Sequence, residues 1–170
     1  LFHRGGHDDP AHLAANAAKS FQGSIVLGMG FTFDDTDKKG VASPLAEMRR
    51  LIAVDPRNAE RILPYIGGEE INTSPTHSHH RYVINFDEMS EMECRRSWPD
   101  LLAIVEAKVK PERLEQNDAG AKEKWWQFIR PRPELHAAIA GLERVLVLAR
   151  ISNSYAPTFL PAGMIYNEKI

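Results

Sequence analysis

RYVINF, residues 81–86, is the segment of this 170-residue chain from which the fold class follows. Four of its six residues are aromatic or β-branched, which favours a strand. The polar sequence NTSPTHSHH (residues 72–80) predicts a loop before this strand, and residues 87–96 predict a helix or helical turn after it. A strand followed by a short helix indicates a fold that contains both kinds of element.

Further strands and helices are expected on both sides of this segment. Strands are predicted at Phe21–Phe33 (FQGSIVLGMGFTF), Arg144–Ser152, Thr158–Leu160 and Met164–Asn167, and Arg144–Ser152 has the pattern of a buried strand. Helices are predicted from Ser43, at Asn58–Leu63 up to the break at Pro64, from Ser97, and at Pro133–Leu142. The elements do not alternate regularly, so the sequence predicts an α+β fold, with a mixed or antiparallel sheet flanked by short helices. Because an expected strand lies directly before Ile170, we expect the sheet to be truncated at the C-terminus.

Length and composition indicate one globular domain. Hydrophobic residues make up 43% of the chain and charged residues 26%, which is typical of such domains. The single cysteine, Cys94, excludes a disulfide framework and a cysteine-rich zinc module, and favours a reducing, cytoplasmic compartment. No apolar run approaches the ~18 residues of a membrane-spanning helix. The net charge of −2 gives no support to a nucleic-acid binder that relies on charge alone.

The first 17 residues are expected to be a leader or the tail of a preceding region, and residues 18–170 to form the domain. The sequence HRGGHDDP (residues 3–10) has no hydrophobic period. The Ala-rich residues 11–18 predict a short helix, with Asp9 as N-cap and Pro10 at its first position. This organisation indicates a piece of a longer protein.

A glycine pair at Gly28-Met29-Gly30 follows an expected strand, as a phosphate-binding loop would. Phe33 stands where the third glycine of G-x-G-x-x-G belongs, and no Lys-Ser/Thr ending is present. The acidic turn that follows, DDTDKKG, would repel a phosphate. A bulged or closely packed strand is therefore the favoured interpretation.

A histidine-rich loop gives the main alternative function. His77, His79 and His80, together with Glu69 or Glu70, are the residue types of a small metal-dependent hydrolase. No Cys or carboxylate stands at a typical ligand spacing within the same loop, which favours a solvated loop. The Glu69-Glu70 pair suits a helix-capping or structural role better than acid–base chemistry.

The segment from Lys122 to Arg150 is the most informative for function, because six Lys and Arg residues stand against three Glu in it. Such cations hold phosphates and read guanine edges, so the local positive charge is suited to DNA. The pair Trp125-Trp126 stands among these charges. We expect it to be mainly a core anchor, with a surface for a protein partner as a third class of function.

Six stretches, in this order along the chain, resemble the target-recognition domain of MmeI-like DNA methyltransferases, which belong to type IIL restriction–modification and phage-defence systems. They are AKSFQGSIVLGMGFTF (18–33), RILPYIGGEEINTSP (61–75), RYVINF (81–86), VKPER (109–113), WWQFIRPRPEL (125–135) and RVLVLARIS (144–152). Each stretch is short, but the ordered series covers most of the chain, from about residue 16 to residue 170.

The resemblance implies a module that binds double-stranded DNA, reads an asymmetric site and is covalently linked to a methyltransferase domain. That domain is expected to use S-adenosylmethionine to methylate adenine N6, and an endonuclease often accompanies it. This sequence lacks the family's catalytic Asn-Pro-Pro-Tyr/Phe motif, so the chain is expected to hold no cofactor or metal and to be non-catalytic by itself. The expected DNA-facing cations and polar contacts are Lys108, Lys110, Arg113, Lys122, Lys124, Arg130, Arg132, Arg150, Ser152, Asn153 and Ser154.

Overall fold

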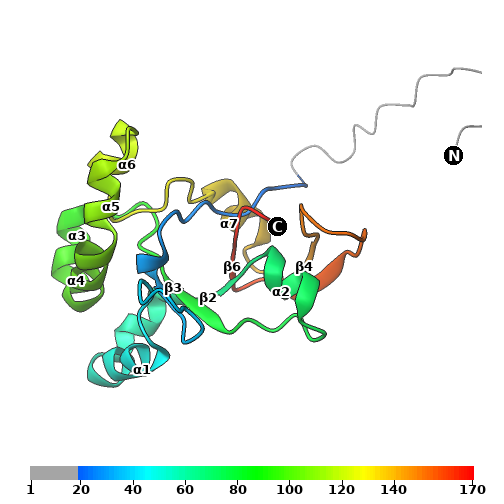
Figure 1. The fold of residues 1–170 in the computed structure, drawn as a ribbon, viewed down its shortest axis with the longest axis horizontal. Helices are drawn as coiled ribbons and strands as arrows, with labels where there is room; N and C mark the ends of the chain where they lie inside the picture. Colours follow the sequence, from blue (N-terminus) through cyan, green and yellow to red (C-terminus); the bar gives the residue numbers. More distant parts are fainter. Residues whose placement is uncertain (1–18) are drawn as a thin grey trace, which may run out of the picture.

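The computed structural model describes residues 19–170, and its centre is a four-stranded mixed sheet (Figure 1). The strands lie in the order β1 (Thr32–Phe33), β3 (Arg81–Ile84), β2 (Ile62–Ile66) and β6 (Ile165–Tyr166). Strand β3 is antiparallel to both of its neighbours, whereas β6 runs parallel to β2. The predicted α+β fold is confirmed, and RYVINF supplies an inner strand of this sheet.

Short helices surround the sheet. They are α1 (Leu45–Val54), α2 (Gly68–Thr73), α3 (Glu91–Ser97), α4 (Pro99–Lys108), α5 (Lys110–Glu115), α6 (Ala119–Glu123) and α7 (Pro133–Ile139), with 3-10 helices η2 (Met29–Phe31) and η3 (Pro56–Glu60). In Figure 1, α3 to α6 gather on one side of the sheet, and α7 lies on the other side with the C-terminal strands. No helix of the described residues is long and apolar enough to cross a membrane. The leader and the helix predicted at residues 11–18 lie outside the described residues.

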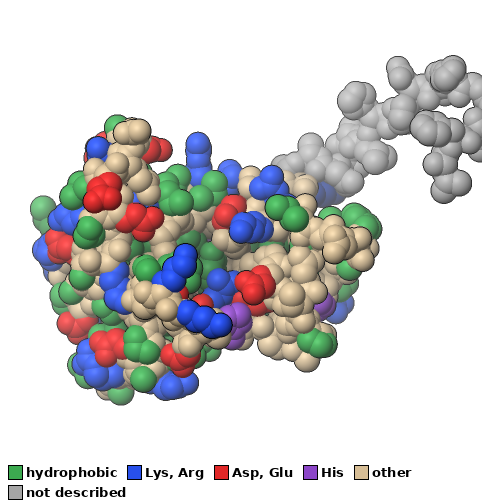
Figure 2. Space-filling model, in the orientation of Figure 1, with side chains coloured by type: hydrophobic (Ala, Val, Ile, Leu, Met, Phe, Trp, Pro, Cys, Tyr) green, Lys and Arg blue, Asp and Glu red, His purple; other side chains and the backbone are tan. Residues whose placement is uncertain are grey.

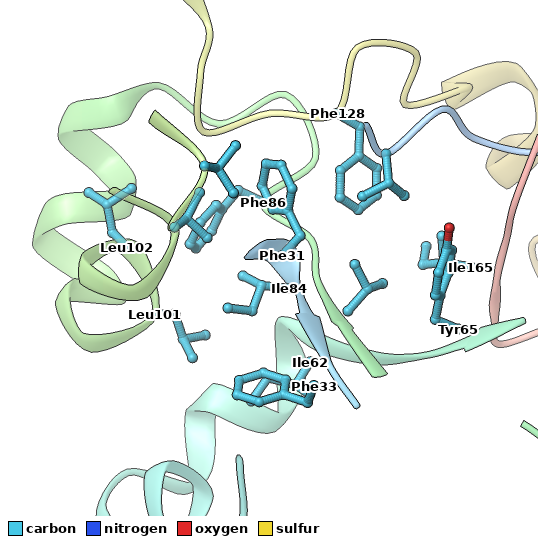
Figure 3. Close-up of a cluster of buried hydrophobic side chains, with 14 of the residues drawn as sticks. Phe31, Phe33, Ile62, Tyr65, Ile84, Phe86, Leu101, Leu102, Phe128 and Ile165 are labelled. Atoms are coloured by element: carbon cyan, nitrogen blue, oxygen red, sulfur yellow. The ribbon is translucent and has the colours of Figure 1, made fainter. Parts of the chain in front are cut away.

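The main core lies between the sheet and the helices on its flank (Figure 3). Its fully buried side chains include Phe31, Phe33, Ile84, Phe86, Leu101 and Leu102. Phe31 and Phe128 meet edge to face, with their ring centroids 5.4 Å apart, which is a favourable aromatic geometry. This contact joins the segment before β1 to the segment between α6 and α7.

A second, smaller sheet packs beside the first. It consists of β4 (Arg144–Val147) and β5 (Thr158–Pro161), which are antiparallel, and it shares a separate core cluster with α2 and α7. The prediction of a buried strand over residues 144–152 is wrong, because only Arg144–Val147 is a strand and Leu146 is 63% exposed. Only one face of this sheet meets the core, so its outward-pointing residues stay in water.

Strand β2 differs from the prediction of a helical turn that ends at Pro64. Only the 3-10 helix η3 precedes it, and Pro64 lies inside the strand. The Asn85 amide donates to the Arg61 carbonyl (2.8 Å), and hydrogen-bonded pairs alternate along an antiparallel ladder. Pro64, opposite Tyr82, therefore occupies a position that needs no N–H toward β3. Toward β6 the pairing covers Tyr65 and Ile66 only, so the proline is tolerated there too.

The segment 21–33, predicted as one strand, is mostly irregular. Ser24 and Ile25 form isolated bridges, η2 follows, and only Thr32–Phe33 is a strand. Gly30 explains part of this path, because a Cβ at that position would lie 2.7 Å from the Cβ of Lys108 and 2.8 Å from a methyl group of Val109. The favoured interpretation of close packing is confirmed at Gly30, where the backbone packs against the end of α4.

Candidate nucleic-acid interface

Two of the predicted DNA-facing arginines meet in one hydrogen-bonded network. Nη2 of Arg132 donates to Oε1 of Gln22 (3.1 Å), and Nε2 of Gln22 donates to the Glu168 carbonyl (3.1 Å). Nη1 of Arg150 donates to the same carbonyl (3.0 Å). The network thus brings together side chains from three distant parts of the chain and holds two guanidinium groups near each other.

A groove lies beside this network, between residues 19–23, α7 and β4, and encloses about 760 Å³. We call it the basic groove. Its charged lining residues are Lys19, Arg144 and Arg150, and no Asp or Glu of the described chain lines it. Its remaining lining is mainly apolar and includes Phe21, Leu135, Ile139, Val147 and Tyr166. A groove with one sign of charge above an apolar floor concentrates negatively charged ligands.

The β4–β5 loop, residues 148–157, begins next to the basic groove. Its base is fixed, because the Arg150 amide donates to the Lys169 carbonyl (2.8 Å) and Nδ2 of Asn72 donates to the Ile151 carbonyl (2.9 Å). Ser152, Asn153 and Ser154 are exposed beyond this base. The Ser154 amide donates to Oγ of Ser152 (3.2 Å). Within the described residues, the side chains of Ser152, Asn153 and Ser154 make no other hydrogen bond. The polar groups of these three residues therefore remain available to a ligand.

The connector before α7 carries Arg130 and Arg132. Arg130 is exposed, and its backbone exchanges two hydrogen bonds with Ile25 (3.0 and 3.2 Å). Arg132 has φ 60°, a left-handed conformation that non-glycine residues seldom adopt, and directly precedes Pro133 at the start of α7. Residues held in this region cluster at functional sites, because the surrounding structure must offset the strain.

The three predicted cations between α4 and α5 are used by the fold. Nζ of Lys108 donates to the carbonyls of Val41 (2.8 Å) and Ala42 (3.0 Å). Lys110 pairs with Glu106 (2.7 Å) and lies over the Trp125 ring. These two ammonium groups hold neighbouring segments together and are less available to a phosphate than a free lysine.

Arg113 corrects a prediction. Only 1% of it is exposed, and Nη2 donates to the carbonyls of Val26 (2.8 Å), Leu27 (2.9 Å) and Gln127 (3.3 Å). Burial lowers the pKa of its guanidinium group from the usual value. The prediction that Arg113 faces DNA is wrong, because this side chain is a cross-link between three backbone segments.

The remaining predicted cations, Lys122 and Lys124, are exposed at the end of α6. Figure 1 places α6 and β4 at opposite ends of the domain. On the face drawn in Figure 2, Lys and Arg side chains are interspersed with Asp and Glu. The predicted cations are thus dispersed, and of them Arg150 lines the basic groove and Arg132 binds Gln22 of its lining, next to the polar residues of the β4–β5 loop.

The histidine loop is organised around a structural carboxylate. Oε2 of Glu70 accepts the Gly67 amide at the start of α2 (3.0 Å), and Oε1 accepts Nε of Arg81 (2.7 Å). Nδ1 of His80 lies 3.6 Å from Oε1, and His79 packs edge-on against Tyr82. Partial burial lowers the pKa of His79. No group of three or more His, Cys, Asp or Glu residues that would suit a metal ion occurs in residues 19–170.

The tryptophan pair belongs mainly to the core, as predicted. Trp125 is 4% exposed, and Nε1 of the half-buried Trp126 donates to the Met89 carbonyl (2.9 Å). Trp125 is buried and Trp126 packs partly against the main core, so the two rings do not favour the alternative of an apolar partner surface.

Sequence reasoning missed several residues of this region. Lys19 and Gln22 were not predicted. The role of Gln22 depends on Glu168 and Arg132, which lie more than 100 residues away, and Lys19 lines the basic groove. Arg144 belonged to the basic stretch but was not singled out, and its guanidinium lies over the Phe159 ring, 4.4 Å from the centroid. Tyr155 is 84% exposed. In its segment, the sequence predicted a DNA contact only for Ser152, Asn153 and Ser154.

The described residues therefore define an α+β domain with a basic groove and an exposed polar loop at one end. No family model and no curated protein matches the chain. A solved structure of similar fold is the type IIL restriction–modification enzyme MmeI in complex with DNA, with a TM-score of 0.57 and 18% sequence identity. The match covers 87% of this chain but 18% of the MmeI chain, so this fold also occurs as one part of a much larger enzyme.

Proposed function

We propose that this chain is the DNA sequence-recognition module of a restriction–modification methyltransferase that acts on adenine N6, and that the module is non-catalytic by itself. The fold shared with a DNA-bound restriction–modification enzyme supports this proposal at the level of architecture. The proposed partner is double-stranded DNA, and the proposed parent protein carries a covalently linked methyltransferase domain.

The observation that carries the proposal is the meeting of Arg132 and Arg150 around Gln22 and the Glu168 carbonyl. Phosphate contacts fix a protein on the duplex, and contacts to base edges supply the sequence specificity. In this domain the arginines suit the phosphates. The free amide of Asn153 and the hydroxyls of Ser152 and Ser154 suit the base edges, and each well-read base pair contributes about 1–3 kcal/mol of discrimination.

The charge balance predicts how the module binds. The whole chain has a net charge of −2, and its positive charge is local to the basic groove. We therefore propose that other domains of the parent protein supply much of the nonspecific attraction to DNA. The isolated module should bind weakly and should lose affinity as salt releases its phosphate contacts.

We assign methyl transfer and the binding of S-adenosylmethionine to the parent's methyltransferase domain. Two properties of this chain support that assignment. The sequence contains no Asn-Pro-Pro-Tyr/Phe motif. The glycine pair at Gly28 and Gly30 packs against Lys108 and Val109 of the α4 terminus, which leaves Gly30 no room for a phosphate.

A selection experiment tests the proposal. The purified chain is incubated at low salt with duplexes that carry a randomised central segment, and bound duplexes are recovered and sequenced over several rounds. A shared asymmetric site should emerge, and binding to it should weaken strongly between 50 and 200 mM salt. Recovered duplexes without a common site, or no binding at 50 mM salt, would contradict the proposal.

A further inference from the structure

Tyr155 differs from the other three tyrosines of the chain. It is 84% exposed, whereas Tyr65 and Tyr166 are buried and Tyr82 is half-buried against His79. Ile151, on the same loop, is 75% exposed. Single exposed apolar side chains are common on protein surfaces, but here an aromatic ring and a large aliphatic side chain are exposed on the same loop.

The loop that carries this ring is firmly mounted. Four residue pairs of the β4–β5 ladder lie beneath it, and the Arg150 amide and Ile151 carbonyl bind Lys169 and Asn72. Figure 1 shows the loop, in orange, at the edge of the domain away from α3 to α6. The anchors fix the base of the loop, so the ring can project into a ligand without a rearrangement of the sheet.

The surroundings of Tyr155 suit a nucleic acid better than a protein. Its neighbours along the loop are Ser152, Asn153 and Ser154, and serine is depleted at protein–protein contacts. Arg150, at the base of the same loop, provides a cation for the phosphates on either side of a base. Aromatic side chains stack on bases of any sequence, and apolar side chains enter between bases where the duplex is partly unstacked.

We propose that Tyr155 stacks on a base at an opened step of the bound duplex, with Ile151 beside it. This inference rests on the proposed DNA-recognition function and adds a contact through which the module opens the base stack. Arg150 contacts the DNA backbone, and the polar residues of the loop contact the base edges. The tyrosine ring then stacks on a base whose neighbouring base has moved away.

The test compares two 30-base-pair duplexes of the same mixed sequence, one fully paired and one with a single central mismatch. Unstacking a mismatched step costs less free energy, so a protein that opens the stack prefers the mismatched duplex. Fluorescence anisotropy at 50 mM salt should show about tenfold tighter binding of the mismatched duplex by the natural chain. Tyr155→Ala should reduce this ratio to about one, and Tyr155→Phe, which keeps the ring, should retain it.

Controls separate this contact from other effects. Met92→Ala removes a side chain that is 81% exposed on α3 and should leave the ratio unchanged. Tyr155→Ala should also leave the salt dependence of binding unchanged, because it removes no phosphate contact. Failure of the natural chain to bind either duplex would overturn the proposed function as well as this inference.

Three other outcomes would overturn this inference alone. These are equal binding of both duplexes by the natural chain, an unchanged ratio in Tyr155→Ala, and a dimer of the natural chain that Tyr155→Ala dissociates. The last outcome would assign the ring to a protein contact.

Discussion

Replacement of Arg150 by alanine should weaken DNA binding by removing one phosphate contact, without weakening the fold. Arg150 is exposed, and its side chain makes one hydrogen bond, to the Glu168 carbonyl. Gln22 donates to the same carbonyl, so the acceptor keeps a partner when the arginine is removed. The backbone amide of residue 150 still binds the Lys169 carbonyl. The melting temperature should therefore stay within about 2 °C of the natural value.

The size of the effect follows from the number of cations around the basic groove. Lys19, Arg144 and Arg150 line it, and Arg132 binds Gln22 of the lining. If each neutralises one phosphate, the slope of log affinity against log salt is about −3.6, at about −0.9 per contact. Affinity should then fall about 150-fold between 50 and 200 mM salt. Without Arg150 the slope becomes about −2.7 and the fall about 40-fold over the same range.

Fluorescence anisotropy over this salt range, with a duplex recovered by selection, measures both slopes. The double variant Lys122→Ala, Lys124→Ala is the matched control, because it removes two exposed cations at the opposite end of the domain. Its slope should equal that of the natural chain. A slope that is unchanged by Arg150→Ala, or reduced by the α6 double variant, would refute the assignment of the interface to the basic groove.

Further predictions concern stability and chemistry. Arg113→Ala should lower the free energy of unfolding in urea by about 3 kcal/mol, because three backbone carbonyls lose their buried donor; an unchanged midpoint would contradict the cross-linking role. Glu70→Gln should lower it by about 2 kcal/mol, since Arg81 loses a buried charged partner, whereas full stability would argue against that pairing. Burial raises the pKa of the Cys94 thiol to about 11, so iodoacetamide at pH 8 should modify it only in unfolded protein, and rapid reaction of the folded chain would count against this. The free energy of unfolding should fall as pH rises from about 9 to 11, because the unfolded chain releases the Cys94 proton that the folded chain keeps. Burial raises the pKa of Tyr166 to about 12, so this residue should extend the fall above pH 10. A pH titration of the urea midpoints checks both effects.

Local sequence signals predicted the elements in which the residues have an intrinsic preference for the structure that they adopt. The aromatic and β-branched content of RYVINF gave β3, and the amphipathic spacing after Pro44 gave α1. Strand β2 was missed because Pro64 normally argues against a strand, and only the pairing pattern of two other strands makes it acceptable. The pairing of the last two strands was not predicted. Strand β5 pairs with β4, whereas β6 crosses to β2, whose partner residues are 100 positions away in the chain.

The predicted cations show why the site was harder to find than the fold. Arg113 and Arg132 both stand near proline in polar sequence, and nothing local separates them. Arg113 is buried because the carbonyls of Val26 and Leu27, 87 and 86 residues away, converge on its guanidinium group. Arg132 meets Gln22, 110 residues away. Whether an arginine serves the fold or a ligand thus depends on residues that are distant in the chain, and a single sequence does not show which of them come close.

The position of the basic groove and polar loop follows from how this fold buries its apolar surface. Helices pack on the four-stranded sheet (Figure 1), and the buried apolar side chains of β1, β2 and β3 form the main core with them. The β4–β5 sheet has two strands, an arrangement that is marginally stable without support. Its support comes from α2, α7 and the C-terminal segment, which cover one face and leave Leu146 and Phe159 exposed on the other. The outer face of this sheet and its loop therefore keep side chains that the core does not engage, and a ligand-reading surface requires side chains of this kind.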